Sequence, residues 1–330
     1  MKIFITGAEG FIGSHLTEFL VKKKYDVTAL VLYNFNSSSG WLSEIEKKNY
    51  KNLKIIYGDV CDLNFIKKNS KSSEVIFHLA ALISIPYSYR SPRSYLDTNI
   101  MGTYNILESS RSNKVKKVII TSTSEVYGTA KYTPINEIHP LQPQSPYSAS
   151  KIAADNLAMS YFYSFGVPIT ILRPFNTFGP RQSTRAIIPS ILTQVLFGNK
   201  IINLGNLSPS RDFTYVKDTV NAFYKCIVAK KIEGEIINIC NGADISIKDL
   251  ISLLKNELNL DFKFLKSKER YRPPKSEVFR LNGDNKKAKR MINWSPEFRG
   301  KKGFIKALKE TFNWYNNKEN IKKFKDFYTS

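Results

Sequence analysis

Short apolar runs alternate with segments of helical period through the first two thirds of the chain. Apolar residues at Ile12, Leu16 and Leu20, for example, follow the first run with the spacing of one helix face. Nearly continuous apolar runs separated by helices are typical of parallel strands that helices cover on both faces. The pattern therefore predicts an α/β fold with a doubly wound parallel sheet, whose strands are expected at residues 2–6, 26–32, 53–57, 75–79, 117–121 and 169–172.

The alternation ends near Phe175, where shorter and more mixed elements begin. Strands are expected at 201–204 and 235–240, and helices at 218–229, 247–259 and 301–315. Because no linker separates the two parts, we expect the second part to be a lobe built onto the first. Residues 1–174 should form the main domain and residues 175–330 a smaller mixed α/β lobe. The polar, lysine-rich end from residue 316 onward is expected to fray.

The composition suits a globular protein with a large core, since 42% of the 330 residues are hydrophobic. The net charge is +22, from 50 basic and 28 acidic residues, but the lysines are scattered along the chain. Such scatter favours a solvated basic surface over a nucleic-acid interface, and it still suits an anionic small molecule as a partner. No apolar run of about eighteen residues is present, so no membrane span is expected.

The cysteines and the N-terminal segment bear on the cellular compartment. Cys61, Cys226 and Cys240 lie far apart and match neither a disulfide framework nor a metal-binding spacing. The first predicted strand begins directly after Met1, without a charged segment followed by an apolar signal core. We therefore expect a cytoplasmic protein with reduced thiols and no metal site.

A glycine-rich turn joins the first predicted strand to the first predicted helix. Gly7, Gly10 and Gly13 have the spacing G-x-x-G-x-x-G, and Phe11 and Ile12 lie at the start of the helix. Glycines at such a turn let a pyrophosphate approach the helix N-terminus closely. The strand before the motif and the helix after it favour a dinucleotide site over a tight turn alone, and hence a sheet of the Rossmann type.

The end of the second predicted strand does not identify the dinucleotide. The acidic residue that holds a ribose hydroxyl and the arginine that reads a 2′-phosphate are both missing from Val31-Leu32-Tyr33-Asn34. Asn34 and the serines at 37–39 suit either cofactor. We expect NAD, with NADP left open.

Two later strand ends are expected to face the same cofactor. Asp59 and Val60 follow the third strand, where an aspartate can meet the adenine amine or simply form a turn. Leu79, Ala80 and Ala81 lie at the end of the fourth strand, and the small alanines suit close approach of the pyrophosphate.

Two segments about twenty residues apart carry groups for proton transfer. Thr123, Ser124 and Glu125 follow the fifth predicted strand, whereas Tyr147 and Lys151 lie one helical turn apart on one face of the next helix. A hydroxyl relay beside a lysine can remove a proton from a substrate alcohol, and a carboxylate can remove a second proton from carbon. A simple dehydrogenase needs no such second base.

Together these motifs resemble the extended short-chain dehydrogenase/reductases that act on nucleotide sugars. The likeness runs from residue 1 to about 315 and rests on Gly7, Gly10, Gly13, Asp59, His78–Ala81, Asn99, Thr123, Tyr147, Lys151 and Arg173-Pro174-Phe175-Asn176. It implies that Tyr147 is the base on the sugar 4-hydroxyl and that Lys151 lowers the pKa of this tyrosine and binds the nicotinamide ribose. It also implies that Thr123 hydrogen-bonds the sugar O4 and that Asn99 contacts the cofactor.

Residues 124 and 125 indicate the subfamily. Sugar 4-epimerases have small or neutral residues there, whereas 4,6-dehydratases have an acid and a base, commonly Asp-Glu. The pair Ser124-Glu125 keeps the base and resembles the GDP-mannose 4,6-dehydratases, as does the stretch Arg272–Val278 followed by Gly283-Asp284. The overall likeness is greatest to the dehydratases of bacterial legionaminic acid synthesis, which act on GDP-N-acetylglucosamine; Leu30–Asn34 and Ser145–Ile152 carry it.

This resemblance implies a 4,6-dehydratase cycle. C4 is oxidised for a time, Glu125 removes the C5 proton, water leaves across C5 and C6, and hydride returns to C6 to give a 4-keto-6-deoxy sugar nucleotide. Ser124 would position a water or the departing hydroxyl. The alternatives are the same reaction on UDP-N-acetylglucosamine or GDP-mannose, a nucleotide-sugar 4-epimerase, and a non-catalytic dinucleotide-binding protein.

The second lobe is expected to hold the nucleotide diphosphate of the substrate. Arginine forks suit phosphate groups, and the candidate substrate-binding residues are Ser84, Tyr87, Asn176, Arg211, Arg272 and Arg280. An ordinary surface ion pair is the alternative for each arginine.

The family likeness also implies a homodimer. The helices after Asn99 and Tyr147 would pair across a two-fold axis into a four-helix bundle. The apolar stripe of Ile152, Leu157, Tyr161 and Phe165 either lines that interface or packs on the sheet.

Overall fold

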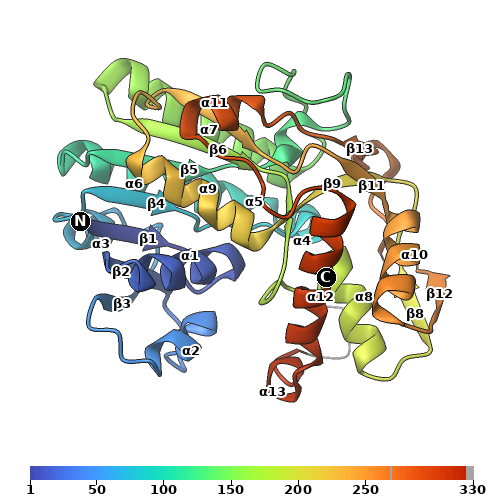
Figure 1. The fold of residues 1–330 in the computed structure, drawn as a ribbon. Coiled ribbons are helices and arrows are strands. Elements are labelled where there is room, and N and C mark those ends of the chain that lie inside the picture. The colour runs from blue at the N-terminus through green and yellow to red at the C-terminus, as the bar shows by residue number, and fades with distance from the viewer. Residues whose placement is uncertain (268–269, 325–330) are drawn as a thin grey trace.

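The computed structural model describes residues 1–267 and 270–324 of the chain. Within these residues, seven parallel strands form the main sheet in the order β10-β6-β5-β4-β1-β2-β3 (Figure 1). The strands are β1 (Lys2–Thr6), β2 (Asp26–Leu32), β3 (Leu53–Gly58), β4 (Val75–His78), β5 (Lys117–Thr121), β6 (Ile169–Pro174) and β10 (Glu235–Ile239). The prediction of a doubly wound parallel sheet of Rossmann type is confirmed, and each of the six predicted runs forms one of its strands.

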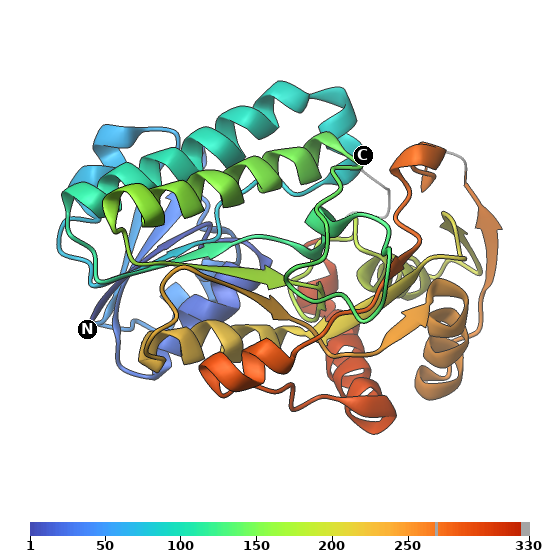
Figure 2. The same ribbon diagram turned by 90° about the horizontal axis from the view of Figure 1, so that it is seen from above.

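Helices cover both faces of this sheet (Figure 2). One face carries α1 (Phe11–Lys22) and α9 (Val216–Val228), and the other carries α3 (Leu63–Asn69), α6 (Gly102–Ser112) and α7 (Pro146–Phe165). Along β1, Ile3 and Ile5 belong to the core shared with α1 and α9, whereas Phe4 belongs to the core shared with α6 and α7. Successive side chains of a strand point to opposite faces, so a strand covered on both sides is apolar throughout.

The smaller lobe lies beyond the carboxyl ends of the main strands (Figure 1). Its four-stranded sheet consists of β7 (Asn176–Phe178), β9 (Ser210–Tyr215), β11 (Asp244–Ser246) and β13 (Arg280–Leu281). A separate parallel pair joins β8 (Ile201–Leu204) to β12 (Lys263–Lys266). The longer helices of the lobe are α8 (Ile187–Leu196), α10 (Ile247–Leu258) and α12 (Gly300–Asn316). The expected mixed α/β character of this lobe is confirmed.

The chain returns from the smaller lobe to complete the main sheet. Strand β10 pairs with β6 along its whole length, from Glu235 opposite Thr170 to Ile239 opposite Pro174. Helix α11 (Lys286–Ile292) packs against β10 and α9. The division of the chain at residue 174 stays a prediction, and the edge strand of the main sheet comes from beyond it.

Short helical segments connect these elements, and the last of them packs back on the main domain. They are η1 (Gly40–Leu42), α2 (Ser43–Glu46), α4 (Ile85–Arg90), α5 (Pro92–Tyr95), η2 (Leu96–Met101), η3 (Ser124–Tyr127), η5 (Pro274–Ser276) and α13 (Lys318–Ile321). The rings of Trp314 and Phe324 lie 5.4 and 5.8 Å from that of Trp41. The chain up to residue 324 is therefore packed, contrary to the expected fraying, whereas residues 325–330 lie outside the described residues. No described helix is long and apolar enough to cross a membrane.

Ion pairs around Glu18 join the two lobes. This residue of α1 accepts hydrogen bonds from Arg181 at 2.6 Å, in the turn after β7, and from Lys22 and Lys48. Beside it, the His15 ring bonds the Pro180 carbonyl oxygen at 3.0 Å. Burial opposes the ionisation of Glu18, but the hydrogen bonds from Lys22 and Arg181 outweigh it and lower the pKa of Glu18 to about 2.

Glu18→Gln should destabilise the protein by about 1–2 kcal/mol at neutral pH, because it removes a partly buried set of charge-assisted hydrogen bonds. The pKa of Glu18 is lowered by folding, so its contribution is complete above the ordinary value of 4.5 and is lost as the pH falls toward about 2. Urea unfolding of both proteins should therefore give a constant difference above pH 5 and a shrinking one below about pH 4. A difference that does not depend on pH would contradict the ion-pair explanation. Glu74→Gln, at an exposed pair with Lys116, should have a much smaller effect.

Candidate active site

The glycine turn after β1 packs against the end of β4. Gly7 has a φ of 65°, and a Cβ atom there would lie 2.7 Å from the Ala80 nitrogen. A Cβ atom at Gly13 would lie 2.1 Å from the Gly7 carbonyl oxygen. Only glycine fits both positions, and the turn leaves a backbone cradle at the carboxyl edge of the sheet, before Gly10 and the first α1 residues, Phe11 and Ile12. This geometry fits the pyrophosphate of a dinucleotide.

Buried hydrogen bonds hold the other wall of the cradle, residues 79–81. Thr6 Oγ1 accepts the N–H groups of Leu79 and Ala80, at 3.2 and 3.1 Å, and lies 2.8 Å from His78 Nδ1. The other ring nitrogen lies 3.1 Å from Thr103 Oγ1. Burial lowers the pKa of His78 to about 3, so this histidine is neutral and structural.

The other predicted cofactor residues lie at the same edge of the sheet but have structural contacts. Asp59 Oδ1 accepts the Cys61 N–H at 2.9 Å, which is the turn geometry considered as the alternative for it. Val60 is buried and adjoins Gly102, where a Cβ atom would lie 2.8 Å from Val60 Cγ1. The Asn99 amide bonds the backbone of Leu82 and the Ser150 hydroxyl, and so joins the loop after β4 to α7. Contacts of these residues with a cofactor stay predictions.

The start of α7 positions the tyrosine and the lysine. Ser145 accepts the Ser148 N–H at 3.1 Å, and Ser148 Oγ accepts the Ser145 N–H at 3.0 Å, so a reciprocal cap fixes the first turn. Tyr147 and Lys151 are only 6% and 2% exposed, and Tyr147 packs with Ile85 and Tyr95. Lys151 Nζ donates to the Thr121 carbonyl oxygen, the last of β5, at 2.7 Å.

Thr123 and Glu125 reach the same site from the end of β5, with the buried Ser124 between them. Thr123 Oγ1 accepts the Glu125 N–H at 3.2 Å and forms a hydrogen bond with the side chain of Tyr147. Burial raises the pKa of Tyr147 well above its usual value, the Thr123 bond opposes the rise, and the charge of Glu125 adds to it. Burial also lowers the pKa of Lys151. A phenol, a hydroxyl, a lysine and a carboxylate therefore share one site, as the sequence predicts.

The smaller lobe brings two arginines to this site. Arg272 Nη1 lies 3.5 Å from Glu125 Oε2, and Arg211 Nη2 of β9 lies 3.5 Å from Glu277 Oε1. Burial lowers the pKa of Arg211, and the charge of Glu125 opposes this. Tyr89 and Ser276 bond each other at 2.6 Å next to the same segment. Two of the predicted substrate arginines thus adjoin the predicted base, at the junction between the lobes.

The remaining predicted substrate residues differ in their surroundings. Arg280 is half exposed and forms a bidentate pair with Asp244, at 2.9 and 3.1 Å, which is the ion-pair alternative. Tyr87 is partly exposed on α4. Ser84 Oγ and Asn176 Oδ1 are buried without a hydrogen-bond partner among the described residues. Buried polar atoms are normally paired, so these two fit positions that a bound substrate completes.

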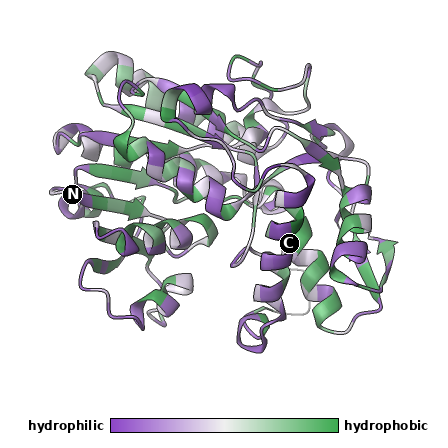
Figure 3. Cartoon of the chain, viewed as in Figure 1, coloured by the Kyte–Doolittle hydropathy of each residue, from purple (hydrophilic) through white to green (hydrophobic). Residues whose placement is uncertain are grey.

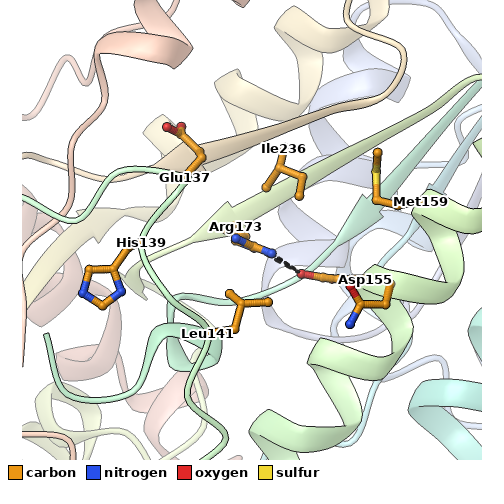
Figure 4. Close-up of a pocket in the computed structure, with 8 residues that line it drawn as sticks. Glu137, His139, Leu141, Asp155, Met159, Arg173 and Ile236 are labelled. Atoms are coloured by element: carbon orange, nitrogen blue, oxygen red, sulfur yellow. Dashed lines mark hydrogen bonds and ion pairs between the residues drawn. The ribbon is translucent and has the colours of Figure 1, made fainter. Parts of the chain in front are cut away.

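A buried ion pair behind the site was not predicted from the sequence. Asp155 Oδ2 accepts hydrogen bonds from Arg173 at 3.1 and 3.0 Å and from Ser122 at 2.7 Å, and Arg173 also donates to the Tyr127 hydroxyl. The negative charge of Asp155 opposes the fall in the pKa of Lys151. The pair lines a pocket of about 140 Å³, shown in Figure 4, with Glu137, His139, Leu141, Asn156, Met159 and Ile236. Lys151 and Asp155 are four residues apart, which places both on one helix face. This spacing could have predicted from the sequence that Asp155 lies near the site.

Within the described residues, no cluster of three or more His, Cys, Asp or Glu side chains is arranged to hold a metal ion.

Known proteins share this fold and chain length. A family model described as GDP-mannose 4,6 dehydratase matches residues 4–306. A putative UDP-glucose 4-epimerase of Methanocaldococcus jannaschii is 32% identical over 320 residues, which cover 96% of this chain and 98% of the relative.

Two solved structures are similar over nearly their whole length. A double mutant of the dTDP-glucose 4,6-dehydratase DesIV from Streptomyces venezuelae, with NAD bound, has a TM-score of 0.88 at 26% identity and covers 97% of this chain and 98% of its own. The UDP-glucuronic acid 4-epimerase of Bacillus cereus, in complex with UDP-glucuronic acid and NAD, has a TM-score of 0.86 at 29% identity. The match covers 98% of this chain and 99% of the epimerase chain. The similar proteins thus include both dehydratases and epimerases. The chain belongs to the extended short-chain dehydrogenase/reductase family of NAD-dependent nucleotide-sugar 4,6-dehydratases and 4-epimerases.

Proposed function

We propose that this protein is a nucleotide-sugar 4,6-dehydratase that converts GDP-N-acetylglucosamine to its 4-keto-6-deoxy product, as in bacterial legionaminic acid synthesis. The observation that carries the proposal is the position of Glu125, a carboxylate within the same site as Thr123, Tyr147 and Lys151. A base for the C5 proton is what a dehydratase needs in addition to the groups that oxidise C4. The choice of a GDP-linked sugar follows from the Ser124-Glu125 pair and the stretch at Arg272.

The glycine cradle fits NAD, which would supply the hydride acceptor for C4 and return the hydride to C6. Tyr147, with its proton removed, accepts the proton of the 4-hydroxyl. Lys151 favours that phenolate by its charge, and Thr123 orients the oxygen through its hydroxyl. Burial raises the pKa of Tyr147, so these cationic and hydrogen-bonding neighbours are needed to form the base near neutral pH.

Glu125 then accepts the C5 proton, which the 4-ketone makes acidic. Ser124 is too weak an acid to protonate the departing 6-hydroxyl, so Glu125 delivers its own proton there and water leaves. One proton is then required at C5, and the one that Tyr147 took from O4 balances the cycle. The charge of Glu125 contributes to the raised pKa of Tyr147, so the two proton-transfer groups act within one site.

The nucleotide diphosphate is proposed to bind at the buried Arg211 and the partly buried Arg272, at the junction of the lobes. A diphosphate at Arg272 would compete with its pairing to Glu125, and so would free the carboxylate when substrate binds. Arg280 is the weaker candidate, because its Nε and Nη2 already donate to both carboxylate oxygens of Asp244.

A 4-epimerase is the second candidate, and the 32% identical relative described as a putative UDP-glucose 4-epimerase favours it. In that case Glu125 would serve only as the ion-pair partner of Arg272. UDP-N-acetylglucosamine and GDP-mannose are the alternative dehydratase substrates, and a non-catalytic dinucleotide-binding protein is the alternative of another class.

Product analysis separates these functions. The purified protein should be incubated with NAD and, separately, with GDP-N-acetylglucosamine, UDP-N-acetylglucosamine and GDP-mannose, followed by mass spectrometry. We expect loss of one water from GDP-N-acetylglucosamine and a keto product that absorbs in alkali. A product of unchanged mass with an inverted C4 would contradict the dehydratase and establish the epimerase. The heat-denatured protein is the control.

A homodimer through α6 and α7 is also proposed. Of the predicted apolar stripe, Tyr161 and Leu157 pack in the core beneath these helices and Ile152 packs beside Phe175, whereas Phe165 is 51% exposed. The exposed apolar side chains of this region are Leu96 and Met101 on η2 and Tyr163 and Phe165 on α7. They, rather than the whole stripe, are the candidates for contacts with a second copy.

A further inference from the structure

We propose that Glu9, in the glycine turn, replaces the acidic residue that is missing from the end of β2 and selects NAD over NADP by receiving a hydroxyl of the adenosine ribose. Enzymes of this fold usually place that acid at the end of the second strand. Here the carboxylate comes from the neighbouring turn instead. The inference rests on the proposed function in one respect only: a dinucleotide must bind at the glycine cradle.

Two of the polar side chains after β2 already have hydrogen-bond partners, Asn34 within its own loop and Ser39 on α2. Asn34 Nδ2 donates to the carbonyl oxygens of Leu32 and Ser38, both at 2.9 Å, and Asn34 Oδ1 accepts the Ser38 N–H at 2.7 Å. Ser39 Oγ donates to a carboxylate oxygen of Glu46. The amide and hydroxyl expected to serve either cofactor are therefore engaged in shaping residues 34–39.

Glu9 delivers a carboxylate to the same place. Strands β1 and β2 are parallel neighbours, so the turn after β1 lies beside the end of β2. Glu9 Oε1 accepts the N–H of Leu32, the last residue of β2, at 3.0 Å. The Glu9 carbonyl oxygen accepts the Trp41 N–H at 3.2 Å, and a Cβ atom at Gly40 would lie 3.0 Å from Glu9 Cβ. The side chain is thus fixed between the glycine turn and η1.

The second carboxylate oxygen of Glu9 differs from the first in its surroundings. Glu9 Oε2 is buried and has no hydrogen-bond partner among the described residues. Burial raises the pKa of Glu9, and the backbone bond from Leu32 opposes the rise. A buried carboxylate without a full set of donors is costly, and a ribose diol supplies O–H donors of the kind it lacks.

The same carboxylate disfavours NADP. A 2′-phosphate would bring its negative charge against a partly buried carboxylate, and like charges in such a setting repel strongly. The positively charged fork that NADP enzymes use to offset this charge is missing at the end of β2, where Leu32, Tyr33 and Asn34 stand. The turn that cradles the pyrophosphate therefore also determines which ribose is accepted.

The test is equilibrium binding of NAD and of NADP to the full chain, measured by calorimetry without substrate. The wild-type protein should prefer NAD. Glu9→Gln keeps an oxygen for the Leu32 N–H but removes the charge, and it should shift the ratio of the two affinities toward NADP by about tenfold or more. Glu9→Asp keeps the charge and should still disfavour NADP. Glu44→Gln, at an exposed carboxylate on the adjacent α2 that pairs with Lys47, should leave the ratio unchanged.

An unchanged ratio in Glu9→Gln, at an unchanged melting temperature, would overturn the assignment of Glu9 and leave the proposed function standing. A wild-type protein that binds neither nucleotide would overturn both. A wild-type protein that prefers NADP would overturn the assignment of Glu9 alone.

Discussion

Glu125→Gln is expected to lower the rate of dehydration by about 10²- to 10⁴-fold, because glutamine cannot accept the C5 proton or pass one to the 6-hydroxyl. Cofactor binding and the melting temperature should hardly change, since the carboxylate pairs with Arg272 only at 3.5 Å. Oxidation of C4 does not need Glu125, so a single turnover should leave reduced cofactor and a 4-keto sugar that still carries its 6-hydroxyl. Absorbance of the reduced cofactor and mass spectrometry of the quenched sugar measure both.

Ser124→Ala is the matched variant for this experiment. If Glu125 handles both protons, removing the neighbouring hydroxyl should slow turnover far less than removing the carboxylate. A dehydration rate in Glu125→Gln close to that of the wild-type protein would rule out this residue as the base. A severe loss in Ser124→Ala would instead assign the acid at C6 to the serine.

Tyr147→Phe should lower turnover by about 10²- to 10⁴-fold and should do so at the first step, because phenylalanine cannot accept the 4-hydroxyl proton. Burial raises the pKa of Tyr147. The phenolate fraction therefore increases with pH, and kcat/KM of the wild-type protein should rise through the neutral range until the pKa in the complex with cofactor is passed. The variant should lose this limb of the profile. Initial rates between about pH 6 and 9 measure it.

Tyr95→Phe is the control for this experiment. Its ring packs edge-on against Tyr147 at a centroid distance of 6.2 Å, but its hydroxyl donates to the Ser84 carbonyl oxygen. It should retain most of the activity and the pH-dependent limb. If Tyr147→Phe kept normal turnover, the whole assignment of this site would be wrong.

The variants Tyr147→Phe and Glu125→Gln should block the reaction at different steps. Tyr147→Phe should block both the formation of reduced cofactor and the loss of water, whereas Glu125→Gln should block only the loss of water. An epimerase would be insensitive to the second substitution, so the pair separates the two functions of the family with one chain and one substrate.

The strands of the main sheet were predictable, because parallel strands buried on both faces are apolar along their whole length. The run at 235–240 was also expected to be a strand, but its own pattern does not say which neighbour it pairs with. Its place beside β6 depends on the path of the whole smaller lobe. The local pattern alone therefore predicts a strand of the smaller lobe and not the edge strand of the main sheet.

In the candidate site, too, contacts between residues close in sequence were predictable and contacts between residues far apart in sequence were not. Tyr147 and Lys151 are one helical turn apart, so their common face follows from helix geometry. The pairing of Glu125 with Arg272 joins residues 147 positions apart and exists only in the folded chain. The hydrogen bonds that Asn34 forms within its own loop could have been predicted, because asparagine side chains commonly bond nearby backbone groups.

The position of β10 at the edge of the main sheet has a consequence for the synthesis of the protein. The ribosome releases the chain from the N-terminus, so the first six strands emerge while β6 still has a free edge, and residues 175–234 follow before β10 (Glu235–Ile239) can cover it. A free apolar edge is a template for pairing with other chains. The newly made chain therefore exposes the apolar edge of β6 during that interval, and this edge is covered only when β10 pairs with it.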